Sequence, residues 1–529
     1  MNNIQIHLLC LLLLTHVTSQ ADQKPNIVLI MCDDMGFSDP GCYGGEIPTP
    51  NIDRLAREGI RFTRFKNAGR CCPSRAALMT GRAQHSVDMG WMTAVDEHRP
   101  GYRGQLSDSV PTMAEILKKL GYGTYLSGKW HLTVDGNYYK VADPRPNGSW
   151  PGDRGFDQNY GGLSGGGSYY TPRGLIRNET LITELPKDYY YTTAITRNAV
   201  GFIQQHDSSK PLFLYLAHYA PHRPLEAPED RVDACRNLYI EGYDVLRQAR
   251  FDRLKQLGIL KTETPLPLHN ADFENHRPAW ETLPEQQKEK WITEMATYAA
   301  MVSIMDDGIG EVVDALKAKG LYENTLLLFL SDNGATAEGG NISKLAAALS
   351  NTPYREYKKS NYHGGVSSPF IVHFPARFQQ QNGSLNRTLS HITDILPTCL
   401  DLAGIPYPAS FKGEPITPPD GVSLLPALQG KSQPKRALFF QHESNCAITD
   451  ETWKLVKHAE NAPWELYDLT KDPFEQTDVA KLHPEIALHL EKQWNQWAKA
   501  NNVLPLYHGA WDERISHFKT QNPDQDGID

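Results

Sequence analysis

Residues 69–82, GRCCPSRAALMTGR, combine a modifiable sulfur with groups that attract anions. Pro73 suits the first turn of a helix, where its missing N–H costs nothing, and Gly81 suits a helix end. We therefore expect Cys71 just ahead of a helix N-terminus, where backbone N–H groups and the helix dipole favour an anion. Arg75 adds a positive charge one turn later. The stretch predicts an anion held beside a cysteine; the alternative is a helix cap with two packed cysteines.

Two pairs of hard oxygen ligands follow apolar runs of the chain. Asp33 and Asp34 come closely after the run NIVLIM, and Asp332 and Asn333 come closely after the run TLLLFL. Carboxylate and amide oxygens suit Ca²⁺ or Mg²⁺ better than zinc. Either pair alone is weak evidence, because Asp-Asp pairs cap helices and Asn-Gly sequences form turns. Their shared position behind two strand-like runs predicts a metal site.

Cationic or titratable side chains lie near the ends of other apolar runs. They are Lys129, His131, His222 and Lys358, with Lys359 as the rival of Lys358. Taken alone, each has a plainer explanation, because lysines are mostly solvated and buried histidines are mostly structural. Together they predict a positively charged pocket near the predicted metal site.

Strand-like runs alternate with stretches of helical spacing. Strands are expected at residues 26–31, 123–126, 212–217, 325–330 and 370–374, and helices at 111–120 and 295–317. This alternation predicts an α/β fold with a large, mostly parallel (mixed) sheet sandwiched by helices. Such sheets bind ligands at the carboxyl ends of their strands, where most of the candidate residues fall. The alternative is that these polar residues only form turns.

Beyond Gly404 the sequence changes to a proline-rich linker and then to short strand-like runs. Strands are expected at residues 437–441, 453–456 and 464–468, and a helix at 484–500. This pattern predicts a smaller C-terminal α+β domain. We assign residues 20–419 to the large domain, 420–518 to the small one and 519–529 to a disordered tail.

The N-terminus and the net charge indicate an exported protein without a nucleic-acid partner. Residues 8–14 form an apolar run too short to span a bilayer, and Val17-Thr18-Ser19 offers a cleavage site. We expect a signal peptide at residues 1–19 and a periplasmic or secreted protein; the alternative is a retained membrane anchor. The net charge of −9 argues against nucleic acid. Without Cys10, seven cysteines remain, and an odd number implies one thiol with another fate.

The spelling Cys-x-Pro-Ser-Arg-x-x-x-Met-Thr-Gly-Arg resembles the signature of the formylglycine-dependent (type I) sulfatases. NIVLIMCDDMG and LLLFLSDNGA resemble the metal-binding motifs of that family, and GKWH and PHRP resemble its cationic segments. Lys358 stands six residues before Gly364-Gly365, where the family has a catalytic lysine, although His363 replaces the usual Glu. The resemblance extends from Asn26 to Glu475 and is strongest to the bacterial arylsulfatase branch.

The resemblance implies an alkaline-phosphatase-like fold and hydrolysis of sulfate monoesters. It implies that Cys71 is oxidised to formylglycine by a maturation enzyme, which is a transient partner. The implied catalytic residues are Cys71, Arg75, Lys129, His131, His222 and Lys358. The implied ligands of one Ca²⁺ are Asp33, Asp34, residue 71, Asp332 and Asn333. The substrate is expected to be a sulfated small molecule or carbohydrate.

Three other interpretations stay open at this point. The chain could be a phosphonate or phosphodiester hydrolase of the same superfamily, a non-catalytic binding protein on this fold, or a calcium-stabilised structural protein. Conversion of Cys71 would account for the odd cysteine, and the pairing of the six others is not readable. The irregular stretches 135–171 and 227–285 are expected to form either the rim of a substrate pocket or surface decoration.

Overall fold

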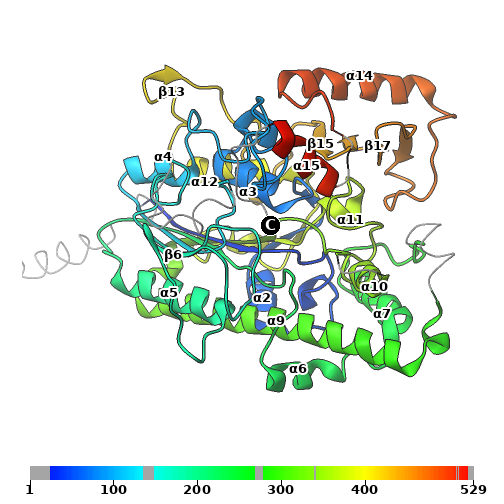
Figure 1. The fold of residues 1–529 in the computed structure, drawn as a ribbon, viewed down its shortest axis with the longest axis horizontal. Coiled ribbons are helices and arrows are strands. Elements are labelled where there is room, and N and C mark those ends of the chain that lie inside the picture. The colour runs from blue at the N-terminus through cyan, green and yellow to red at the C-terminus, as the bar shows by residue number, and fades with distance from the viewer. Residues whose placement is uncertain are drawn as a thin grey trace, which may run out of the picture.

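The computed structural model describes residues 24–134, 148–268, 278–338, 341–507, 509 and 511–521. The expected signal peptide at 1–19 lies outside the described residues, as does most of the expected tail at 519–529. The molecule is built on a ten-stranded sheet with the order β11-β2-β10-β9-β1-β8-β4-β5-β6-β7, seen edge-on in Figure 1. Its strands are β1 (Asn26–Cys32), β2 (Ile60–Phe62), β4 (Gly123–Gly128), β5 (Gln158–Gly162), β6 (Leu175–Arg177), β7 (Thr180–Leu181), β8 (Leu212–Ala217), β9 (Thr325–Ser331), β10 (Phe370–His373) and β11 (Leu385–Asn386).

The five central strands, β9-β1-β8-β4-β5, are all parallel, and the strands outside them are mixed. The predicted mostly parallel α/β sheet is therefore confirmed. β10 runs antiparallel to β9, which the sequence did not reveal. As a result, the loop before β10 reaches the same sheet edge as the loops after the parallel strands. This direction brings the lysine at 358 to the edge where the carboxylates lie.

Side chains of β1 alternate between two hydrophobic cores, one on each face of the sheet. Val28 and Ile30 belong to the core between the sheet and the helices α5 (Tyr191–Gln205) and α9 (Glu285–Ala318), whereas Leu29 and Met31 belong to the core between the sheet and the helices α3 (Cys71–Thr80) and α12 (Ile395–Leu402). Continuous apolar runs are what strands buried on both faces require. In Figure 1, α5, α9 and α2 (Pro50–Arg57) lie below the sheet, and α3, α4 (Met113–Lys119) and α12 lie above it.

The helices predicted at 111–120, 295–317 and 484–500 are present with shifts at some of their ends, and several further helices, such as α5 and α12, were not predicted. They are α2 (Pro50–Arg57), α3 (Cys71–Thr80), α4 (Met113–Lys119), α5 (Tyr191–Gln205), α6 (Glu229–Arg236), α7 (Gly242–Gln256), α9 (Glu285–Ala318), α10 (Asn341–Ser350), α11 (His363–Val366), α12 (Ile395–Leu402), α13 (Leu425–Leu428), α14 (Pro484–Ala500) and α15 (Trp511–Gln521). α9 begins ten residues earlier than predicted, because its first turns are charged and carry little apolar periodicity. None of the described helices combines the length and apolar character needed to cross a membrane.

A smaller C-terminal domain is present, as predicted. Its antiparallel sheet consists of β15 (Leu438–His442), β16 (Asn445–Thr449), β17 (Trp453–Lys457) and β18 (Glu465–Asp468), and α14 packs against it. The sequence analysis missed β16. Two-stranded pairs join β3 (Phe65–Lys66) to β12 (Ser390–His391) and β13 (Ser410–Phe411) to β14 (Glu414–Pro415). α15 returns to the large domain, where the Arg514 guanidinium lies over the Trp91 ring. The domain boundaries given above remain a prediction.

Candidate active site

The predicted site residues come from separate strand ends and meet at one edge of the large sheet. The backbone holds them in register: Asp332 N–H donates to the Cys32 carbonyl at 3.2 Å. Lys129 N–H donates to the carbonyl of Ala217, at the end of β8, at 2.8 Å. Asp33, Asp332 and Lys129 are all buried. The parallel register of β1, β8, β4 and β9 thus creates the site.

Arg75 joins the acidic strand ends. Its Nη2 atom lies 2.8 Å from Asp332 Oδ2 and 3.2 Å from Asp33 Oδ2, and none of the three side chains is exposed. Lys129 Nζ lies 2.5 Å from Asp33 Oδ2. Burial raises the pKa of Asp33, but Lys129, His222 and Arg75 outweigh it and lower that pKa to about 2. At Asp332, burial and the Asp33 charge raise the pKa.

Asp34 is the second centre of the charge network. Its backbone is in the left-handed region, with φ 68°, and its carboxylate turns toward the loop before β10. Lys358 Nζ lies 2.7 Å from Asp34 Oδ1, and Asn333 Nδ2 donates to the same oxygen at 2.6 Å. His222 Nε2 lies 3.7 Å from Asp34 Oδ2. Lys359, in contrast, turns away from this carboxylate to Glu338, 3.7 Å away, so the geometry favours Lys358.

Residue 71 is the first residue of α3, with Arg70 as its N-cap, and not the residue ahead of the helix as predicted. The whole helix is buried, and Cys71 is 1% exposed. The pKa of the Cys71 thiol is lowered by a hydrogen bond with Cys72 and by the charges of Lys129, His131 and Lys358, against the effect of burial. The helix start and these cations make residue 71 a place where a negative charge is stabilised.

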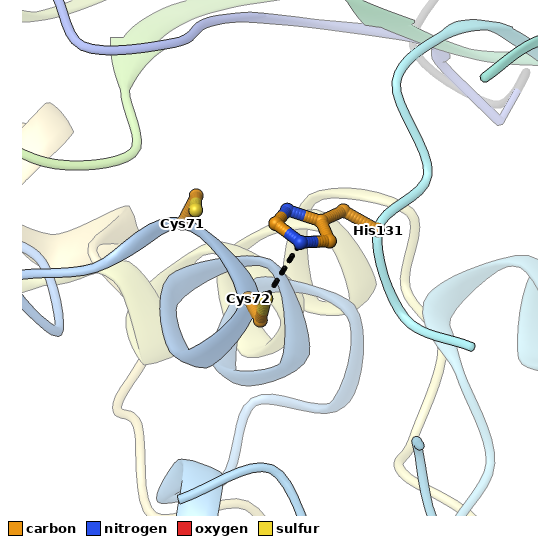
Figure 2. Close-up of side chains that lie close together, drawn as sticks. All are labelled: Cys71, Cys72 and His131. Atoms are coloured by element: carbon orange, nitrogen blue, oxygen red, sulfur yellow. Dashed lines mark hydrogen bonds between the residues drawn. The ribbon is translucent and has the colours of Figure 1, made fainter. Parts of the chain in front are cut away.

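His131 reaches the start of α3 from the segment after β4, and Figure 2 shows it beside both cysteines. Its Nε2 atom lies 3.1 Å from the sulfur of Cys72. Cys72 stands at the x of the Cys-x-Pro signature, for which the resemblance implies no role, and this contact was not foreseen. Only the fold brings residue 131 to within reach of residue 72.

Sequence reasoning also missed two tyrosines of the site. Tyr215 on β8 lies 3.4 Å from Arg75 Nη1 through its hydroxyl. The Tyr219 ring lies 5.3 Å from Lys129 Nζ, and its hydroxyl is 3.1 Å from His222 Nδ1. The position of Tyr219, three residues before His222, was the available signal. His218 is buried, and burial lowers its pKa to about 3.

Seven cysteines lie in the described residues, all buried, and none of them forms a disulfide. The thiols of Cys32 and Cys42 have pKa values raised chiefly by burial, so they are not activated. Burial also raises the pKa values of the thiols of Cys235, Cys399 and Cys446, whereas the pKa of the Cys71 thiol is lowered. The odd thiol inferred from the sequence therefore differs in its pKa shift from these five thiols.

The sulfatase family profile matches residues 25–405. A second profile, described as N-sulphoglucosamine sulphohydrolase, C-terminal, matches residues 356–500. The chain belongs to the sulfatase family. Residues 71, 129, 222 and 332, which form the site, all lie within the first match.

Other members of the sulfatase family resemble this chain over most of its length. An arylsulfatase of Klebsiella aerogenes is 33% identical over 78% of this chain and 94% of its own length. Human steryl-sulfatase is 31% identical over 89% of this chain and 80% of its own length. The crystal structure of Ps i-CgsB in complex with k-i-k-neocarrahexaose superposes with a TM-score of 0.68, at 26% identity, over 94% of this chain and 98% of that one. This sulfatase is therefore a sulfuric ester hydrolase, as the sequence predicted.

Proposed function

We propose that this sulfatase hydrolyses sulfate monoesters of aryl alcohols or carbohydrates through a formylglycine made from Cys71. The position of residue 71 carries the proposal: it starts α3, is buried, and is influenced by Lys129, His131 and Lys358. Backbone N–H groups at a helix start favour sulfate, and the cations add to this preference. A maturation enzyme that oxidises Cys71 is a partner that the proposal requires.

Buried oxygen atoms of the site fit a hard cation. Asp33 Oδ1 and Asn333 Oδ1 have no hydrogen-bond partner among the described residues, which is unusual for buried polar atoms. We infer that Asp33, Asp34, Asp332, Asn333 and the oxidised residue 71 would hold one Ca²⁺. When bound, the ion would supply positive charge for a sulfate oxygen and for the nucleophile.

The cationic side chains are placed to bind the sulfate group. Lys129 and Lys358 each contact a carboxylate of the site and are almost completely buried. Burial lowers the pKa of Lys358, but Asp34 outweighs it and raises that pKa above the ordinary value, so the ammonium group stays charged. Fixed charges in a buried site stabilise the charge that develops as the ester bond breaks. We assign both lysines to sulfate binding.

Two histidines are assigned to proton transfer. His222 Nδ1 lies 2.5 Å from the Arg223 carbonyl, which only accepts hydrogen bonds, so Nδ1 carries a hydrogen and Nε2 faces the site. We assign proton donation to the leaving oxygen to His222, in the form that carries a proton on Nε2 as well, or to Lys358, and we assign His131, which lies beside residue 71, to the release of sulfate. A hydrated aldehyde supplies two hydroxyls on one carbon, one to attack sulfur and one whose ionisation expels sulfate.

The replacement Cys71→Ala tests the proposal. We expect sulfate release from p-nitrophenyl sulfate to fall to background, because no nucleophile remains, while the unfolding transition stays close to that of the wild type. Cys446→Ala, which removes a buried cysteine of the C-terminal sheet, is the matched control and should retain activity. Mass spectrometry of the peptide with residue 71 should show an aldehyde in the active enzyme. Sulfate release by Cys71→Ala would refute the proposal.

The rival activity is phosphodiester or phosphonate hydrolysis at the same site. Comparing p-nitrophenyl sulfate with a phosphodiester of the same alcohol separates the two. We expect kcat/KM to favour the sulfate by roughly 100-fold or more, about 2.7 kcal/mol in transition-state binding. A preference for the phosphodiester would replace the proposed substrate class.

A further inference from the structure

Soft ligand atoms gather at the start of α3. Cys71, Cys72 and His131 each present one ligand atom, and these three atoms all lie within 4.8 Å of one another. Figure 2 shows the two cysteines on the first turn of the helix and the imidazole approaching them from the side. The proposed function uses residue 71 and His131, but it gives no role to the sulfur of Cys72. The arrangement of the three ligand atoms therefore needs an explanation of its own.

The spacing suits a tetrahedral metal site. Zinc binds sulfur at about 2.3 Å and nitrogen at about 2.0–2.1 Å, which places neighbouring ligand atoms about 3.5–3.8 Å apart. Cys72 Sγ and His131 Nε2 are 3.1 Å apart, and the third atom lies within the 4.8 Å limit. All three side chains are 2% exposed or less. Small side-chain movements would bring the three atoms to coordination distances in a site shielded from water.

The chemistry of the ligands selects the cation. Two sulfurs and one imidazole nitrogen favour Zn²⁺ or Cu⁺ over the hard cation expected at the carboxylates. A further soft atom lies close by, since Met92 Sδ is 3.7 Å from Cys72 Sγ. Two thiolates would cancel the charge of a divalent ion, so its burial would not leave a net charge.

We propose that the chain as translated, with Cys71 still a thiol, binds one thiophilic cation through Cys71, Cys72 and His131. Binding releases the thiol protons, and the sulfur of Cys71 is then held by the metal. The inference rests on the proposed function in one respect, which is that oxidation of Cys71 removes this sulfur. The unconverted chain thus binds a thiophilic cation at the start of α3, whereas the converted enzyme lacks the Cys71 sulfur that this site needs.

Cobalt is the probe, because thiolate-to-cobalt charge-transfer absorption reports sulfur ligands and carboxylates give none. Full-length protein is purified with Cys71 unconverted, which mass spectrometry verifies, then freed of metal and titrated with Co²⁺. We expect one equivalent to produce the charge-transfer band, and Zn²⁺ to displace it. In Cys72→Ala the affinity should fall tenfold or more and the band should weaken. Cys72→Ser serves as a second variant in case the alanine protein folds poorly.

Cys235→Ala is the matched control, because Cys235 is a buried cysteine on α6, in the core on the other face of the sheet. Its titration should match that of the wild type. The inference is overturned if the unconverted chain shows no charge-transfer band, or if the band survives unchanged in both Cys72 variants. Sulfate release by converted enzyme is measured separately. An active converted enzyme whose precursor binds no cobalt refutes this inference alone, and inactive enzyme with a cobalt-binding precursor refutes only the proposed function.

Discussion

Asp332 is a completely buried acidic residue whose side chain is held by Arg75. Its carboxylate is unexposed and accepts hydrogen bonds from Arg75 Nη2 at 2.8 Å and Nε at 3.1 Å. Burial and the neighbouring charge of Asp33 nevertheless raise the pKa of Asp332. An asparagine of the same shape would still accept a hydrogen bond from Arg75, whose guanidinium would keep Asp33 as a charged partner. It is the metal, in the proposed function, that needs the charge.

The change Asp332→Asn separates metal binding from folding. We expect calcium affinity to fall roughly 10- to 100-fold and turnover to fall with it, because a charged oxygen ligand is lost. The unfolding midpoint in metal-free buffer should stay close to that of the wild type. Calcium content is measured by atomic emission after dialysis. Asp306→Asn, at a buried aspartate on α9, is the control, and a wild-type calcium content in Asp332→Asn would contradict the metal assignment.

At the scale of elements, α3 is the part that positions residue 71. The helix ends at Gly81, which has φ 67° in the left-handed region and donates its N–H to the Ala77 carbonyl. A Cβ atom at Gly81 would lie 3.1 Å from side-chain atoms of both Leu396 and Pro419. The end of α3 is thus tightly enclosed, and its start, with residue 71, is buried as well.

The change Gly81→Ala should destabilise the protein more than Gly320→Ala does. Gly320 has φ 72° but no atom within 4 Å of a built Cβ, so it reports the backbone cost alone, about 1–2 kcal/mol. Gly81→Ala adds the crowding against Leu396 and Pro419. The free energies of unfolding from urea titrations measure the difference. Equal losses of unfolding free energy in the two variants would show that the added methyl group is accommodated at the C-terminal end of α3 and would contradict the prediction.

At the scale of the whole molecule, a buried polar cluster joins the C-terminal domain to the loop that carries Lys358. Lys454 Nζ, on β17, lies 2.5 Å from Glu475 Oε1, and Glu475 Oε2 accepts from the His363 backbone at 2.8 Å. Lys66 Nζ and Lys454 Nζ both lie 3.1 Å from His363 Nδ1. Burial and the nearby lysines lower the pKa of His363, which keeps it neutral. The single carboxylate of Glu475 thus offsets the positive charge of the lysines in a cluster that includes residues of both domains.

The change Glu475→Gln should be strongly destabilising. It leaves buried lysines without a carboxylate, and breaking a buried ion pair costs about 3–5 kcal/mol. We expect a lower unfolding midpoint and, because residues 355–363 lose an anchor, a higher KM. Glu485→Gln is the control, since its side chain is 72% exposed and should change stability by less than about 1 kcal/mol. A wild-type midpoint in Glu475→Gln would show that the cluster does not hold the domains together.

Stability should fall in acid because of buried histidines. Burial lowers the pKa of His85, His391 and His442 from 6.5 to about 3. Between these two pH values the unfolded chain binds more protons than the folded chain. The stabilising contribution of these histidines is therefore fully present above pH 6.5 and is lost as the pH falls toward 3. Each histidine contributes about 1.4 kcal/mol per pH unit. Urea unfolding at several pH values measures the slope, and His85→Gln should make it shallower; an unchanged slope would contradict the assignment.

The sequence by itself predicted five strands of the large sheet, several helices and the candidate site residues, but not α5, α12 or β16. Long apolar runs such as NIVLIMC are typical of strands buried on both faces, and the polar residues behind them were therefore expected at the sheet edge. The signature around residue 71 consists of residues that are close together in the sequence, so it could be recognised without knowledge of the fold. Domain boundaries and the roles of single residues remain predictions.

Only the tertiary structure decided which of these residues touch. The contacts that favour Lys358 over Lys359 depend on the antiparallel direction of β10 and the turn before it, whereas in the sequence only the spacing to Gly364-Gly365 pointed to Lys358. The contact of His131 with Cys72 joins segments 59 residues apart. Local propensities act over a few residues, whereas such contacts follow from the packing of the whole sheet. For that reason the residue types of the candidate site could be identified from the sequence, whereas the contacts and distances between them could not.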